Sequence, residues 1–172
     1  AGQYEAAEAA YRQSLEIFAQ SNKRSEQASS LGQLGNLYGD QLSRPEEAVT
    51  FYRQAADIFV ELKDLRSEGF ARNNIADKLI KLERYDEAWL EIQRAIVCDQ
   101  QFGHAAEPWK TFGVLQQIET AQDNPKAAKV AWTQARDAYL GYRQQGGYAQ
   151  YSAGKLADEI FKLIGQGEAD KA

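Results

Sequence analysis

The residue types that most often carry out catalysis are few in this chain and poorly placed for it. His104 is the one histidine, and it has no serine or cysteine partner and no carboxylate at ligand spacing. Cys98 occupies a position at which the other copies of an internal repeat, described below, have apolar residues. We therefore expect Cys98 to be a small buried hydrophobic residue and not a nucleophile. Gly146 and Gly147 lack the lysine and the glycine spacing of a phosphate-binding loop. We therefore expect no enzymatic activity, no cofactor and no metal.

Adjacent carboxylates include two pairs, Glu46 with Glu47 and Asp86 with Glu87. Both pairs lie where a helix is expected to begin, and negative charge interacts favourably with that end of the helix dipole. A role at helix starts explains the two pairs without acid–base chemistry.

Composition and charge limit the class of protein. The chain is 44% hydrophobic and 26% charged and has only 3 Pro among many good helix formers, which favours an all-α fold. Its net charge of −5, without a basic patch, argues against a nucleic-acid partner. No apolar run approaches the roughly 20 residues that span a bilayer, so we expect no membrane partner. One cysteine fits a reducing compartment, and we expect the cytoplasm.

The clearest order in the sequence is an internal repeat. The segment YRQSLEIF at 11–18 returns 41 residues later as YRQAADIF at 52–59, and the register then continues in steps of 40. Columns spaced by 4, 3 and 3 residues share one face of an α-helix, where small and large residues alternate, so each copy should be a buried packing helix. The four columns are Ala7, Ala48, Ala88 and Ala128; Tyr11, Tyr52, Ile92 and Trp132; Ser14, Ala55, Ala95 and Ala135; and Ile17, Ile58, Cys98 and Ala138.

A second helical pattern lies between these copies. Leu34 and Gly35 return 41 residues later as Ile75 and Ala76. The two patterns alternate along the chain, which predicts antiparallel helix pairs.

Short breaks separate the two helices of each pair. They precede Pro45, Tyr85 and Pro125, and proline is well placed in a first helical turn because its missing N–H costs nothing there. We expect Ser43 and Asn124 to cap the helices that follow them.

The alternating patterns resemble the tetratricopeptide repeat over roughly residues 3 to 145. The resemblance implies an α-solenoid, a right-handed superhelix of stacked antiparallel helix pairs. The period of 40 to 41 residues exceeds the usual value of roughly 34 and resembles the longer, kinesin-light-chain-like subtype. The residues that carry the resemblance are Leu31, Leu34, Gly35, Tyr38, Ala48, Tyr52 and Ala55.

We expect one repeat domain over residues 1–172. The amphipathic segment 148–165 should form a C-terminal capping helix, the eighth of the chain, followed by a disordered tail at 166–172. The sequence has no methionine, even at position 1, so we expect an excerpt of a longer chain.

Four residues depart from the columns. Gln116 and Glu119 stand where a small residue and an apolar residue are expected, which predicts loose packing in the third pair. Trp89 and Trp109 are most simply packing residues, and partial exposure is the alternative because both lie off the strongest columns.

The resemblance implies that the first helix of each pair lines a concave groove. Asparagine carries donors and an acceptor, so Asn36, Asn73 and Asn74 are suited to the main chain of an extended peptide, although solvated helix residues are an equal alternative. The expected groove residues are Gln33, Asn36, Asp40, Asn73, Asn74, Asp77, Lys81, Lys110 and Gln117.

This chain resembles, in part, the family members that bind the C-terminal carboxylate of a peptide through lysine, asparagine and arginine side chains. Asn36, Asn74 and Lys110 match their pattern, whereas Gly32 and Val114 replace two of its three cations. We therefore expect modest binding, in which Lys110 attracts a carboxylate.

These patterns favour a protein–protein or protein–peptide interaction module, a scaffold or sensor segment of a larger regulatory protein. A receptor domain for a small signalling peptide that switches an attached effector remains the alternative. The first helix has no partner helix before it, so its uncapped face is a candidate surface for homo-oligomerisation.

Overall fold

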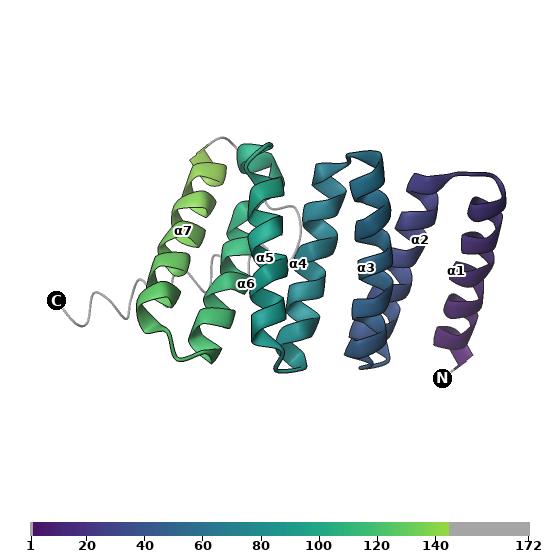
Figure 1. Ribbon diagram of the computed structural model, residues 1–172, viewed down its shortest axis with the longest axis horizontal. Coiled ribbons are helices and arrows are strands. Elements are labelled where there is room, and N and C mark those ends of the chain that lie inside the picture. Colours follow the sequence, from purple (N-terminus) through teal and green to yellow (C-terminus); the bar gives the residue numbers. More distant parts are fainter. Residues whose placement is uncertain (1, 145–172) are drawn as a thin grey trace.

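The computed structural model describes residues 2–144, apart from the side chains of residues 104, 105, 143 and 144. Within this range the chain is a single stack of seven α-helices in which consecutive helices pack together, and it contains no strand (Figure 1). The predicted all-α solenoid is confirmed. The helices are α1 (Gly2–Gln20), α2 (Arg24–Asn36), α3 (Pro45–Leu62), α4 (Leu65–Lys81), α5 (Tyr85–Asp99), α6 (Pro108–Ala121) and α7 (Pro125–Gln144), with a π-helical turn η1 (Leu37–Gln41) after α2 and a 3-10 turn η2 (Gly103–Ala106) before α6.

The predicted breaks are confirmed, because α3, α5 and α7 begin at Pro45, Tyr85 and Pro125. The prediction that Ser43 caps α3 is wrong. Ser43 has a left-handed backbone with φ 52°, and Arg44 occupies the N-cap position without a side-chain hydrogen bond.

Most helix ends share one turn geometry. At the end of α4, Glu83 has a left-handed backbone with φ 57°, and the N–H of Arg84 donates to the carbonyl of Leu79 over 2.9 Å. This bond spans five residues, as in a Schellman turn, and satisfies a carbonyl that the helix leaves without a partner. The other left-handed residues of this kind are Asn22, Lys63 and Asp123.

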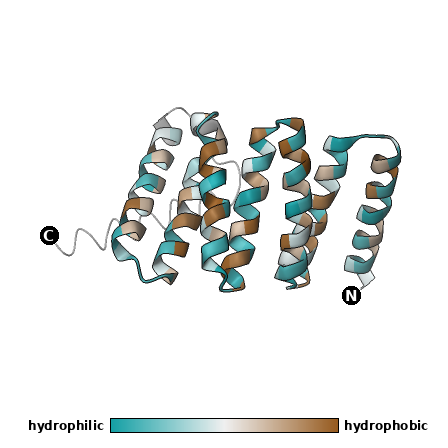
Figure 2. Cartoon of the chain, viewed as in Figure 1, coloured by the Kyte–Doolittle hydropathy of each residue, from teal (hydrophilic) through white to brown (hydrophobic). Residues whose placement is uncertain are grey.

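The predicted columns form the core between the helices. Ala48 and Ala88 are fully buried, and a Cβ on Gly35 would lie only 2.6 Å from Cε1 of Tyr52, so this contact requires glycine. Apolar residues recur along the middle helices with polar residues between them (Figure 2). The α1 end differs, since Ile17 is 53% exposed whereas its counterpart Ile58 is 5% exposed.

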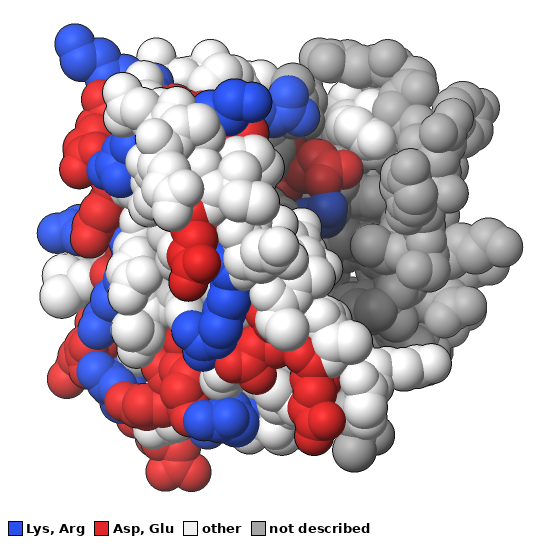
Figure 3. Space-filling model, turned by 90° about the vertical axis from the view of Figure 1, so that its right-hand side faces the viewer, with Lys and Arg blue, Asp and Glu red and all other residues white. Residues whose placement is uncertain are grey.

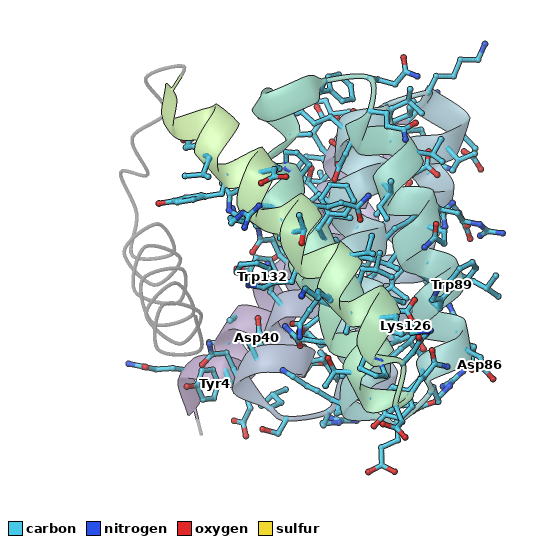
Figure 4. All side chains as sticks on the ribbon, turned by 90° about the vertical axis from the view of Figure 1, so that its left-hand side faces the viewer. Tyr4, Asp40, Asp86, Trp89, Lys126 and Trp132 are labelled. Carbon is cyan, nitrogen blue, oxygen red and sulfur yellow. The ribbon has the colours of Figure 1, made fainter. Side chains whose placement is uncertain are left out.

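The third pair is not loosely packed at Glu119, contrary to the prediction. Glu119 is buried, and its carboxylate accepts hydrogen bonds from Nε1 of Trp89 at 3.1 Å and Nδ2 of Asn124 at 2.9 Å. Trp89, labelled in Figure 4, is partly exposed, which was the alternative given for it. Trp109 is buried against the ring of Tyr139, as expected of a packing residue.

No helix within residues 2–144 is both long enough and apolar enough to cross a bilayer. Acidic and basic side chains are interspersed over the face shown in Figure 3. The predicted capping helix at 148–165 and the predicted tail at 166–172 lie outside the described residues.

Candidate functional site

The even-numbered helices line one face of the stack, which carries two adjoining hollows. The first hollow, of about 340 Å³, lies between α2 and α4. The second hollow, of about 310 Å³, lies between α4 and α6. Arg66, Phe70 and Asn74 of α4 line both hollows, so we treat the two as one groove.

The first hollow has an aromatic lining. Tyr52 and Phe59 reach it from α3, and Phe70 of α4 stands at its edge with 67% of its surface exposed. Burial raises the pKa of Tyr52 to about 12, so the phenol stays protonated and donates to Oδ1 of Asn36 over 2.5 Å. This bond leaves Nδ2 of Asn36 as a donor without a partner among the described residues.

The second hollow has a carboxylate in its lining. Asp99, the last residue of α5, accepts a hydrogen bond over 2.6 Å from Oγ1 of Thr111, which in turn accepts one from Nδ2 of Asn73 over 3.1 Å. Burial raises the pKa of Asp99, an effect that the hydrogen bond from Thr111 partly offsets. None of the ion pairs found among the described residues involves Asp99.

Several predicted groove residues line these hollows. Asn74 lines both, and its Nδ2 atom is buried without a hydrogen-bond partner in the described part of the chain. Gln33 is exposed and lines the first hollow. Lys110 lines the second but forms an ion pair with Glu107 of the preceding turn.

Asp40 and Asp77, the two carboxylates predicted for the groove, form ion pairs with Lys78, which was not among the predicted groove residues. The ammonium of Lys78 lies 2.6 Å from Oδ1 of Asp40 and 2.9 Å from Oδ2 of Asp77. Burial alone would lower the pKa of Lys78, but the hydrogen bonds to these two carboxylates raise it above its usual value. Lys78 therefore links α4 to η1 through Asp40, and its pair with Asp77 lies within α4.

Three predicted residues lie outside the lining of both hollows, namely Asp40, Lys81 and Gln117. Asp40, labelled in Figure 4, belongs to η1. Lys81 is exposed, and its ammonium lies 3.8 Å from Oδ2 of Asp77. Gln117 is exposed on α6.

Asp99 is not among the groove residues predicted from the sequence, although the repeat contains a signal for it. Phe18, Phe59, Asp99 and Tyr139 follow one another at steps of 41, 40 and 40 residues. One carboxylate thus replaces an aromatic ring in an otherwise aromatic column.

Residues 1–61 match the model of the tetratricopeptide repeat family. This is the family that the alternating helix pairs predicted, and tetratricopeptide repeats generally mediate protein–protein interactions. No curated protein matches the chain.

A solved structure has the same tetratricopeptide-like fold. The crystal structure of BtubC (BKLC) from P. vanneervenii superposes with a TM-score of 0.71 at 19% sequence identity. The match covers 87% of this chain and 61% of that chain, so this chain spans about three fifths of its length. At this identity the likeness concerns the fold alone, and the kinesin-light-chain-like subtype stays a prediction.

Proposed function

We propose that the chain is a non-catalytic interaction module that binds an extended segment of a partner protein in the groove, as part of a larger regulatory protein. The observation that carries the proposal is Asn74, whose buried Nδ2 lacks a hydrogen-bond partner at the junction of the two hollows. A buried donor without a partner costs on the order of 1 to 3 kcal/mol, and a ligand that satisfies it recovers this energy.

Asn74 is suited to bind either kind of peptide group. A half-turn about its last side-chain bond exchanges Nδ2 with Oδ1, and no hydrogen bond among the described residues opposes this rotation. Asn36 adds an amide donor from the preceding even-numbered helix, held in place by the hydroxyl of Tyr52. The two amides can bind a main chain regardless of its sequence.

Phe70 gives the groove an apolar contact. Its ring is 67% exposed and lines both hollows, so a bound segment would cover it from either side. Exposed aromatic residues that become buried on association often dominate binding energy. The ring contributes little to the stability of the stack because most of its surface faces water.

The first prediction tests Phe70 and Asn74. A photo-crosslinking residue at Gln33 should capture the partner in the cells that make the protein, and the purified pair is then titrated by calorimetry. Phe70→Ala should weaken binding about tenfold or more with an unchanged melting temperature. Asn74→Ala should cost about 1 to 3 kcal/mol of binding.

The matched control is Val97→Ala, because Val97 is 60% exposed on α5 and lines neither hollow. It should leave the affinity unchanged. A captured partner whose affinity is the same for Phe70→Ala, Asn74→Ala and the unaltered chain would place the binding surface elsewhere and contradict the proposal.

A further inference from the structure

We infer that the bound segment carries a basic side chain that pairs with Asp99 in the second hollow and an apolar side chain that enters the first hollow. This inference rests on the proposed function and names the chemistry of the partner. It differs from the expectation that Lys110 attracts a carboxylate.

The two hollows are equivalent parts of successive repeats, with one decisive difference. Phe59 of α3 lines the first hollow, and Asp99 of α5, 40 residues later in the same column, lines the second. The ring offers an apolar contact, whereas the carboxylate offers a negative charge. At this column the lining of the groove therefore changes from an aromatic ring to a carboxylate over one repeat.

The charges around the second hollow favour a cation as ligand. Asp77 is paired with Lys78, and Glu107 is paired with Lys110. Asp99 is half-buried and receives a hydrogen bond from the neutral hydroxyl of Thr111. It is thus the carboxylate of this hollow whose charge no described side chain balances.

Two cations also line the second hollow, Arg66 and Lys110. Both are exposed, so water and salt screen their charges. Asp99 is less screened because it is half-buried, and its interaction with a ligand charge is correspondingly stronger. An acidic side chain in this hollow would meet Asp99 while Lys110 is already paired with Glu107.

Structure also sets the spacing of the two side chains. The helices α4 and α6, even-numbered helices of successive repeats, pack against each other. Packed helices lie about 8–10 Å apart, and an extended chain advances about 3.3 Å per residue. We expect the apolar and the basic residue to be separated by about three positions. Lysine and arginine are long enough to reach a carboxylate in the wall of a groove from a main chain at its mouth.

The test uses a phage-displayed library of random 12-residue peptides, selected on the unaltered chain. Enriched peptides should carry Lys or Arg about three positions from an apolar residue. A synthetic peptide of that sequence should bind about 10- to 100-fold more weakly to Asp99→Asn, which keeps the shape and the acceptor for Thr111 but removes the charge. The affinity for the unaltered chain should fall as salt is added.

A second variant, Asp99→Phe, places in the second hollow the residue that lines the first. Selection on it should replace the basic residue by an apolar one. The control is Asp57→Asn, which makes the same change of net charge at an exposed position on α3 outside both hollows and should leave the affinity unchanged. Circular dichroism melting shows which variants are folded, and Asp99→Asn alone decides the question if Asp99→Phe does not fold.

Two sets of outcomes separate the inference from the proposed function. Peptides that lose affinity for Phe70→Ala but carry acidic residues, or no preferred charge, would overturn the inference and leave the groove as the binding site. Peptides that bind Phe70→Ala and Asn74→Ala as well as the unaltered chain, or a library without any enrichment, would overturn both.

Discussion

The left-handed residues of the four Schellman-type turns are Asn22, Lys63, Glu83 and Asp123, none of which is glycine. In Glu83, φ is 57°, a region where the Cβ atom crowds the backbone at a cost of roughly 1 to 2 kcal/mol. The bond from the N–H of Arg84 to the carbonyl of Leu79 holds this conformation. The sequence showed where the helices break, but a glutamate gives no hint of a left-handed backbone.

Glu83→Gly should therefore stabilise the protein. Glycine adopts positive φ without steric cost, so we expect the free energy of unfolding to rise by up to about 1 kcal/mol. Chemical denaturation followed by circular dichroism measures the change. Glu83→Ala is the control, since alanine keeps the Cβ atom and should bring no gain; an equal gain from both variants would show that the side-chain charge, not the backbone, is responsible.

The amide side chains of the groove could be predicted from the sequence, whereas the ion pairs of its charged side chains could not. Asn36 and Asn74 follow from helical register alone, because register fixes which face a residue occupies. Asp40 and Asp77 are also in register, but Lys78 from a neighbouring position pairs with both. Spacing says nothing about the direction of a long side chain, and this is why their ion pairs were not foreseen.

The π-helical turn η1 corresponds to one additional residue between the columns of α2 and α3. Gly35 and Ala48 are 13 residues apart, whereas Ala76 and Ala88, like Gln116 and Ala128, are 12 apart. The π-helical turn at Leu37–Gln41 lies inside the longer interval. A π-helical turn accommodates an extra residue without breaking the helix, so the columns on either side keep their contacts.

Deleting Gln41, an exposed residue of η1, should convert this turn to an α-helix. The interval then becomes 12 residues, and we expect the free energy of unfolding to fall by no more than about 1 kcal/mol. Deleting Lys81 at the exposed end of α4 is the control. Without Lys81, the residues that follow are rotated by about 100° about the helix axis and lose their place in the packing columns. The same denaturation experiment should then show a fall of several kcal/mol in the free energy of unfolding. Equal costs for the two deletions would contradict the role given to η1.

Ion pairs link successive repeats outside the apolar core. Glu87 of α5 accepts hydrogen bonds from Arg84, just before the same helix, and from Arg53 of α3. These bonds lower the pKa of Glu87 to about 2. Arg84 also pairs with Glu46 at the start of α3. The fold was predictable because its packing repeats at constant register, but these individual pairs depend on rotamers that no period encodes.

The lowered pKa of Glu87 predicts that the protein loses stability as the pH falls. The pKa of Glu87 is lower in the folded chain than the ordinary value of 4.5, so its stabilising contribution is complete above that value and is lost as the pH falls towards about 2. Glu87→Gln should therefore show a smaller loss of stability between these pH values, measured by urea denaturation. Glu83→Gln is the control because Glu83 has no ion pair among the described residues. Identical pH profiles for Glu87→Gln and the unaltered chain would rule out this linkage.

The evolution of such a repeat protein can depend on a single column, here Phe18, Phe59, Asp99 and Tyr139. Cohesion between helices depends on the alanine columns, while the character of each hollow depends on one residue in another column. Duplication of a repeat followed by substitution at that residue would lengthen the recognised segment by about three positions. Each new copy could thus acquire its own preference while the inherited contacts stayed intact.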